Sequence, residues 1–193
     1  MYYILWYRIN LKKAVEASKD AIFPQPKEEL AKILIPAEWK EMQPLTKHSR
    51  SYRLVNWGTV LVIILFSGLF TLALVTDWFQ SEFLNLIYFF CVAISAIHHP
   101  GNFYICQNGL VLNGKYHSFT QVKHYQVEQI IRWHDLYGLD SRVNNAYKLS
   151  FDVKNTFTQP NFIVIEDLES LNTIVGLLQK HNISKKNEIQ QAK

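Results

Sequence analysis

The sequence predicts a membrane α-helical hairpin followed by an α+β domain, with both chain ends on the cytoplasmic side. Three observations support this fold class: a long uncharged apolar stretch, a second apolar stretch soon after it, and short β-like runs that end in an amphipathic helical pattern. Of the 193 residues, 49% are hydrophobic. A chain of this length can hold membrane segments and one small domain.

The first predicted span is residues 57–76, a stretch without a charged residue. A helix needs roughly 20 apolar residues to cross a hydrocarbon core of about 30 Å. Tryptophans bracket the stretch and basic residues precede it, as expected at the two headgroup levels. The predicted membrane-interface residues are Trp57, Trp78, Arg50, Arg53 and Lys47.

The second predicted span is residues 83–97, which is near the lower length limit, so a re-entrant or interfacial segment is the alternative. The turn between the two stretches, residues 77–82, holds two acids and no Lys or Arg, while ten basic residues lie on each side. The positive-inside rule then places the turn outside. We therefore expect a two-pass integral membrane protein with cytoplasmic N- and C-termini, or termini in an equivalent positive-inside compartment.

Residues 1–53 read as a cytosolic segment of short helices broken by prolines, with residues 28–35 as one amphipathic helix. An aromatic cluster opens this segment. It fits the headgroup region, a contact patch for another subunit, or packing on the cytosolic domain, and the pattern does not choose among them. The cluster consists of Tyr2, Tyr3, Trp6 and Tyr7.

Residues 100–183 are predicted to form the cytosolic domain, and residues 184–193 a disordered polar tail. Asn108-Gly109 and Asn113-Gly114 separate apolar runs, which predicts two consecutive β-hairpins. Residues 122–133 continue as a longer strand, with candidate core positions at Val122, Val127, Ile131 and Trp133.

The second half of the domain contains a polar loop and two further strands. Residues 136–145 are the loop, and the alternation over 147–153 and the apolar run 162–165 predict the strands. A helix then starts after Asp167 and ends near His181. Its apolar stripe is Leu168, Leu171, Ile174, Val175 and Leu178.

This pattern resembles the bacterial pleckstrin-homology-like domains that follow two transmembrane helices in small membrane proteins. The resemblance covers about residues 100–182. It is carried by residues 105–112, by 118–127, by 147–153, and by the last strand and helix. It implies an antiparallel sheet or split barrel with a C-terminal amphipathic helix, and a binding or scaffold role without catalytic residues. The family's common tryptophan would fall at Phe119.

No residue pattern indicates a nucleic-acid, metal or catalytic site. The net charge of +4 is not concentrated on a basic face, which argues against nucleic acid. The histidines lack metal-ligand spacing, and no nucleophile elbow or phosphate loop is present, so we expect no metal, no cofactor and no enzymatic activity.

The expected function is that of a membrane-anchored scaffold that displays a PH-like domain. The alternatives are an accessory or assembly subunit of a large membrane complex and a sensor of anionic lipids. The expected partners are the lipid bilayer and other membrane proteins, and no pattern indicates an oligomeric state. The candidate lipid or partner contacts in the domain are Lys115, Lys123, Arg132 and Arg142.

Overall fold

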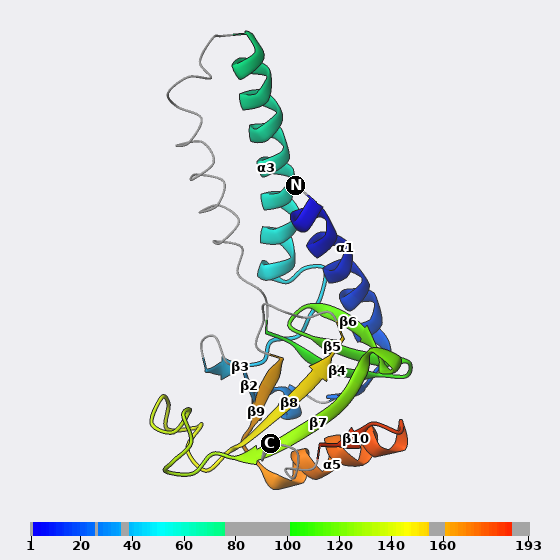
Figure 1. The fold of residues 1–193 in the computed structure, drawn as a ribbon, viewed down its shortest axis with the longest axis vertical. Coiled ribbons are helices and arrows are strands. Elements are labelled where there is room, and N and C mark those ends of the chain that lie inside the picture. The colour runs from blue at the N-terminus through cyan, green and yellow to red at the C-terminus, as the bar shows by residue number, and fades with distance from the viewer. Residues whose placement is uncertain (1, 26, 36–38, 76–100, 155–160, 187–193) are drawn as a thin grey trace, which may run out of the picture.

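The computed structural model describes residues 2–25, 27–35, 39–75, 101–154 and 161–186. In chain order the elements are α1 (Tyr2–Ala17), η1 (Ser18–Asp20), β1 (Ala21–Phe23), α2 (Lys27–Ala31), β2 (Ile33–Ile35), β3 (Lys40–Glu41), α3 (Arg50–Val75), β4 (Phe103–Cys106), β5 (Gly109–Leu112), β6 (Lys115–Ser118), η3 (Phe119–Gln121), β7 (Val122–Gln129), β8 (Tyr147–Val153), β9 (Phe162–Ile165), α5 (Leu168–Lys180) and β10 (Ser184–Lys185). Figure 1 shows α1 and α3 rising from one end of a body of β-sheets, with α5 at the other end.

Two sheets make up the body of the molecule. One has four strands in the order β1-β4-β5-β6, and the other has six in the order β10-β7-β8-β9-β2-β3. The N-terminal strands belong to these sheets, because β1 pairs with β4 and β2 pairs with β9. The predicted purely helical N-terminal segment is therefore corrected. The predicted helix over residues 28–35 ends at Ala31, and β2 follows because Ile33 and Leu34 are fully buried in the sheet layer.

Both predicted hairpins form, although the first turns one residue earlier than expected. Leu112 pairs with Lys115, and Asn113 and Gly114 between them have φ of 51° and 73°, as a two-residue hairpin loop requires. In the first hairpin Cys106 pairs with Gly109, so the loop is residues 107–108. Gly109 is required for space instead, since a Cβ there would lie 2.2 Å from the carbonyl oxygen of His117.

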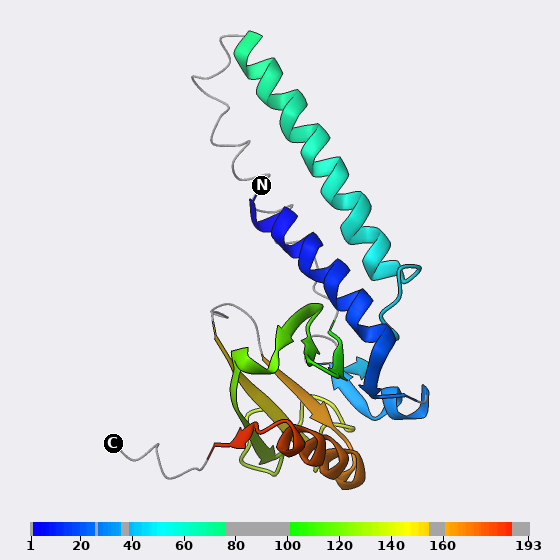
Figure 2. The same cartoon turned by 90° about the vertical axis from the view of Figure 1, so that its right-hand side faces the viewer.

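The main core lies between the sheets and is closed by the helices. The predicted strands over 147–153 and 162–165 are confirmed as β8 and β9. The predicted C-terminal helix is confirmed as α5, drawn in orange-brown in Figure 2. Asp167 is its N-cap residue. Three members of its predicted stripe are buried, at about 1.5–3 kcal/mol each, whereas Leu168 in the first turn is exposed. The buried members are Leu171, Ile174 and Leu178.

Strand β7 is shorter than predicted. It ends at Gln129, and the chain turns away after Ile130, whose backbone exchanges hydrogen bonds with residues 145 and 146. Ile131 and Trp133, which we expected in the core, are exposed, and the exposed fraction of Trp133 is 86%. These two side chains are corrected to surface positions.

The start of the predicted disordered tail is ordered. Residues Ser184 and Lys185 form β10, which pairs in parallel with His124 and Tyr125 of β7. The remainder of that prediction, residues 187–193, lies outside the described residues.

The predicted two-pass membrane hairpin is not supported. Within the described part of the chain, no helix has both the length and the apolar character needed to cross a bilayer. The second predicted span and Trp78 lie outside the described residues. The fold class is corrected to α+β with two sheets, and the predicted membrane localisation is corrected with it.

Candidate functional site

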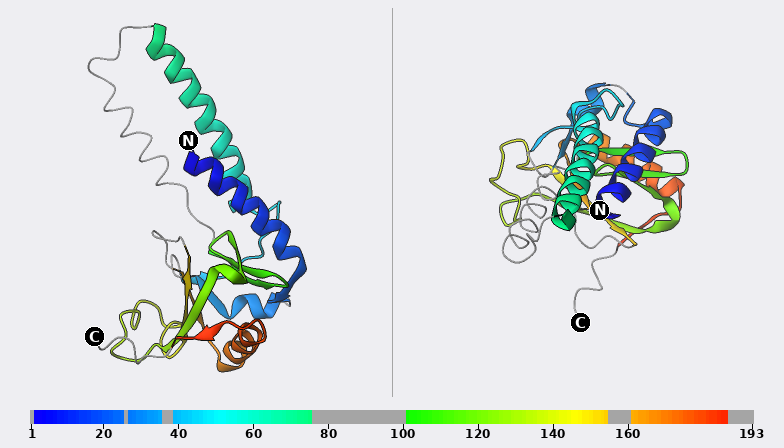
Figure 3. Two further views of the ribbon diagram at one scale, coloured as in Figure 1. Left: turned by 45° about the vertical axis from the view of Figure 1, so that its right-hand side comes forward. Right: turned by 90° about the horizontal axis from the view of Figure 1, so that it is seen from above.

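The most exposed apolar surface of the helices lies on α3. Helix α1 packs against β6 and against the lower part of α3, as the two views of Figure 3 show. In the lower turns of α3, Val55 and Thr59 are buried on one face. Nearly opposite them, at about 100° per residue, the helix exposes large apolar side chains, Leu65 among them. We call the four that follow one another at three- and four-residue spacing the α3 seam. The α3 seam consists of Leu54, Trp57, Leu61 and Ile64.

The α3 seam has the spacing of a helix-pairing surface. Its members follow one another at intervals of three, four and three residues, which is the a/d pattern that packs against another helix. The predicted interface residue Trp57 is part of it and is 69% exposed. Lys47 and Arg53 are exposed next to its first turn, while the Arg50 side chain lies outside the described part of the molecule. The predicted interface set is thus partly assembled at one end of α3.

The predicted aromatic cluster does not act as one patch. Tyr7 is fully buried in the main core. Trp6 is partly exposed, and its ring lies under the ammonium of Lys115, with 5.0 Å between Nζ and the ring centroid. The side chains of Tyr2 and Tyr3 lie outside those that the structure describes. For Tyr7, packing on the domain is therefore the correct alternative among the three that the sequence left open.

Two buried polar side chains lie on the side of β6 that faces α1. Lys115 and His117 alternate along β6, so both face the same side as the Trp6 contact, and both are buried. Burial lowers the pKa of Lys115, and no described carboxylate offsets this effect. Burial, with a smaller effect of the Lys115 charge, lowers the pKa of His117 to about 4. Lys115 is therefore part of the interior and does not present a cation to lipid.

Arg142 is an internal anchor. Its guanidinium forms a two-point contact with the carboxylate of Glu166, in which Nη2 lies 3.0 Å from Oε2 and Nε donates to Oε1. Nη1 donates to Oε1 of Glu41 at 3.0 Å, and Nη2 donates to the carbonyl of Ala31 at 2.9 Å. Glu166 raises the pKa of Arg142 further above its usual value. These contacts tie the loop of residues 131–145 to β3, to the end of α2 and to the end of β9.

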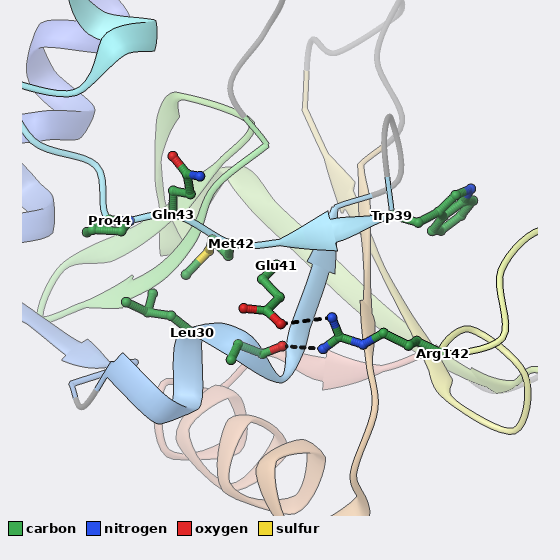
Figure 4. Close-up of a pocket in the computed structure, with 8 residues that line it drawn as sticks. Leu30, Trp39, Glu41, Met42, Gln43, Pro44 and Arg142 are labelled. Carbon is green, nitrogen blue, oxygen red and sulfur yellow. Dashed lines mark hydrogen bonds and ion pairs between the residues drawn. The ribbon is translucent and has the colours of Figure 1, made fainter.

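A pocket of about 600 Å³ lies beside this anchor (Figure 4). It is lined by Leu30, Ala31, Trp39, Glu41, Met42, Gln43, Pro44 and Arg142. Arg142 and Glu41 are the charged residues of the lining and are bonded to each other. Figure 4 shows the guanidinium bonded to the carboxylate of Glu41 and to the carbonyl of Ala31. Arg142 makes four hydrogen bonds within the protein, so little of its guanidinium is left to fix a small ligand.

A second polar cluster joins the loop to the sheet. The carboxylate of Glu128 accepts hydrogen bonds from Lys148 at 2.8 Å and Gln126 at 2.8 Å, and lies 3.2 Å from His134 Nε2. Lys148 is the main reason that the pKa of Glu128 is lowered. Among the described residues, no group of His, Cys, Asp and Glu side chains could hold a metal ion.

The four predicted cationic contacts do not form a common face. Lys115 is buried and Arg142 is engaged by two glutamates, as described above. Lys123 lies 3.7 Å from the carboxylate of Asp152, and Arg132 is exposed on the loop. These four positions therefore do not make up one basic surface, and binding of anionic lipid stays a prediction.

Sequence reasoning missed the α3 seam as an interaction surface, because the whole stretch was assigned to a membrane span. The three-four spacing was the signal that could have shown it.

Comparisons of the chain with protein-family models, with curated proteins and with solved structures find no match. The resemblance to PH-like domains therefore stays a prediction.

Proposed function

We propose that this protein is a non-catalytic interaction module, an assembly or scaffold subunit that binds an α-helical segment of another protein along the α3 seam. The observation that carries this proposal is the exposure of Leu54, Trp57, Leu61 and Ile64 on one face of α3. Contiguous exposed apolar patches on a folded protein mark interaction sites. The two polar clusters around Arg142 and Glu128 are engaged in contacts within the fold, which favours a structural role for them over catalysis.

The spacing of the seam favours a helical partner. Side chains at positions a and d of one helix insert between four side chains of a facing helix, and the 54-57-61-64 pattern supplies these knobs. Helix α1 already covers the other side of α3, so a third helix would extend an existing helix-packing layer. Arg53 and Lys47 at the base, with the positive end of the helix dipole, fit an acidic residue on the partner.

The test is co-purification of the tagged full-length chain from its own cells, followed by native mass measurement and identification of the bound protein. Affinity for that purified partner is then compared between the wild type, Leu61→Lys and Ser67→Lys. Ser67 is exposed on the same helix about 100° from the centre of the seam, so it controls for an added charge. A lysine in the centre of the seam is expected to weaken binding about 30-fold or more, as at an interface hot spot.

Ser67→Lys is expected to stay within about threefold of the wild type. Equal affinity of the two variants would refute the proposal, provided that both keep the wild-type circular dichroism spectrum. A mass corresponding only to copies of this chain would also refute it. So would co-flotation with lipid vesicles in the absence of a bound protein.

A further inference from the structure

The loop of residues 131–145 lies at the end of the molecule away from the top of α3 (Figure 1). It exposes large apolar side chains. With an exposed fraction of 86%, the Trp133 side chain is the most exposed of the large apolar side chains in the described residues. Leu139, Ile131 and Tyr137 are exposed on the same loop. We call these four side chains the loop patch. A protruding indole with apolar neighbours is the composition of an interface hot spot.

The backbone of the loop is closed on itself. The amide of Ile130 donates to the carbonyl of Ala146 at 2.8 Å, and the amide of Asn145 donates to the carbonyl of Ile130 at 3.0 Å. Within the loop the amide of Gly138 donates to the side-chain oxygen of Asn144 at 2.8 Å. Gly138 has a φ of 85°, a conformation that glycine adopts without strain.

The inner side of the loop is fixed to the six-stranded sheet. A small apolar core lies beneath it, made of Leu34, Ile130, Val143, Ala146 and Val164. On either side of that core, Arg142 contacts Glu41 and Glu166, and His134 contacts Glu128. The loop patch is therefore held in place before any partner arrives, which lowers the entropy that binding must overcome.

The charges around the loop patch select the kind of partner. Five acidic residues of the loop and its anchors outnumber three basic ones, so the local net charge is −2. The acidic residues are Glu41, Glu128, Asp135, Asp140 and Glu166, and the basic ones are Arg132, Arg142 and Lys148. Anionic membrane surfaces attract clusters of Lys and Arg, which this surface lacks. A protein pocket with an apolar floor and a basic rim complements it in shape and charge.

We propose that the loop patch is a second docking surface, which inserts Trp133 into an apolar, basic-rimmed pocket of a partner protein. Because it lies away from the α3 seam, both surfaces can be occupied at once, and the chain then bridges two proteins. The proposal does not depend on the α3 seam. A variant at either surface leaves the other one intact, so each of the two docking proposals can be refuted without refuting the other.

The first step of the test places the photo-crosslinking residue p-benzoylphenylalanine at position 133 of the full-length chain in its own cells. The same residue at Thr120, an exposed position on η3, is the control. A discrete protein adduct from position 133 and not from 120 is expected. The adduct is identified by mass spectrometry, and that protein is then purified for binding measurements.

The second step measures the affinity of the identified protein for Trp133→Ala, Asp135→Lys and Thr120→Ala. Loss of the indole is expected to weaken binding about 30-fold or more. Asp135→Lys is expected to weaken it several-fold, and less at high salt, because the variant repels a basic rim. Thr120→Ala is expected to bind like the wild type.

The proposal is overturned by any of four results. These are adducts that do not differ between positions 133 and 120, adducts with lipid, adducts with a second copy of this chain, and unchanged affinity of Trp133→Ala. Because Trp133 is exposed, the alanine variant is expected to keep the wild-type urea midpoint, so lost binding is not lost folding.

Discussion

Acidification is expected to destabilise the fold through His117. The side chain is buried between β6 and α1 beside Lys115, and its pKa falls from 6.5 to about 4. The unfolded chain therefore binds a proton on this ring at a pH where the folded chain does not. The resulting stability is complete above about pH 6.5 and is lost as the pH falls towards 4.

The size of the effect follows from the two pKa values. The difference between 6.5 and about 4, at about 1.4 kcal/mol for each pH unit, amounts to about 3 kcal/mol. Domains of this size have a total stability of about 5–15 kcal/mol, so this loss is readily measured. The assay is urea unfolding, followed by circular dichroism, at several pH values between 7 and 4.5.

His117→Gln isolates this histidine from the other groups that titrate over the same range. Gln cannot be protonated, so the variant is expected to lose less stability than the wild type between pH 7 and 4.5. His48→Gln is the matched control, because His48 is exposed, and it is expected to keep the wild-type pH dependence. Parallel pH profiles for the wild type and His117→Gln would show that the reasoning is wrong.

Three further outcomes are expected. Lys115→Met removes a buried charge that no described carboxylate balances, and it is expected to raise the free energy of unfolding by about 1 kcal/mol; lower stability in urea would contradict this. Arg142→Lys cannot reproduce the two-point contact with Glu166, so we expect a loss of about 1 kcal/mol and faster amide hydrogen exchange in residues 130–146, whereas unchanged exchange would contradict the anchor. Burial raises the pKa of the Cys106 thiol to about 11. In a Cys91→Ser variant, iodoacetamide at pH 8 is therefore expected to label Cys106 about 100-fold more slowly in the folded than in the unfolded chain, and equal rates would contradict this.

Local patterns predicted the elements that form from neighbouring residues. The Asn113-Gly114 turn, the alternation of β8 and the stripe of α5 each lie within a few residues of sequence, and all three are confirmed. Such features depend on backbone conformation and periodicity, which the sequence carries directly. The first hairpin was placed one residue late, because Gly109 is needed for its close approach to His117 rather than for a positive φ.

Contacts between distant segments of the chain determined which side chains are exposed and which are paired. The same apolar residue type is a core or a surface residue depending on where the chain turns, and Trp133 is exposed because β7 ends before it. Arg142 was recognised as a candidate cation, but its partner Glu41 lies 101 residues away, so its role as an anchor was not predictable. The apolar stretch of residues 57–76 likewise did not show that its base packs against α1 or that its exposed side has the spacing of a helix-pairing seam. The sequence determines local conformation, whereas the exposure and the pairing of each side chain depend on which distant segments the fold brings beside it.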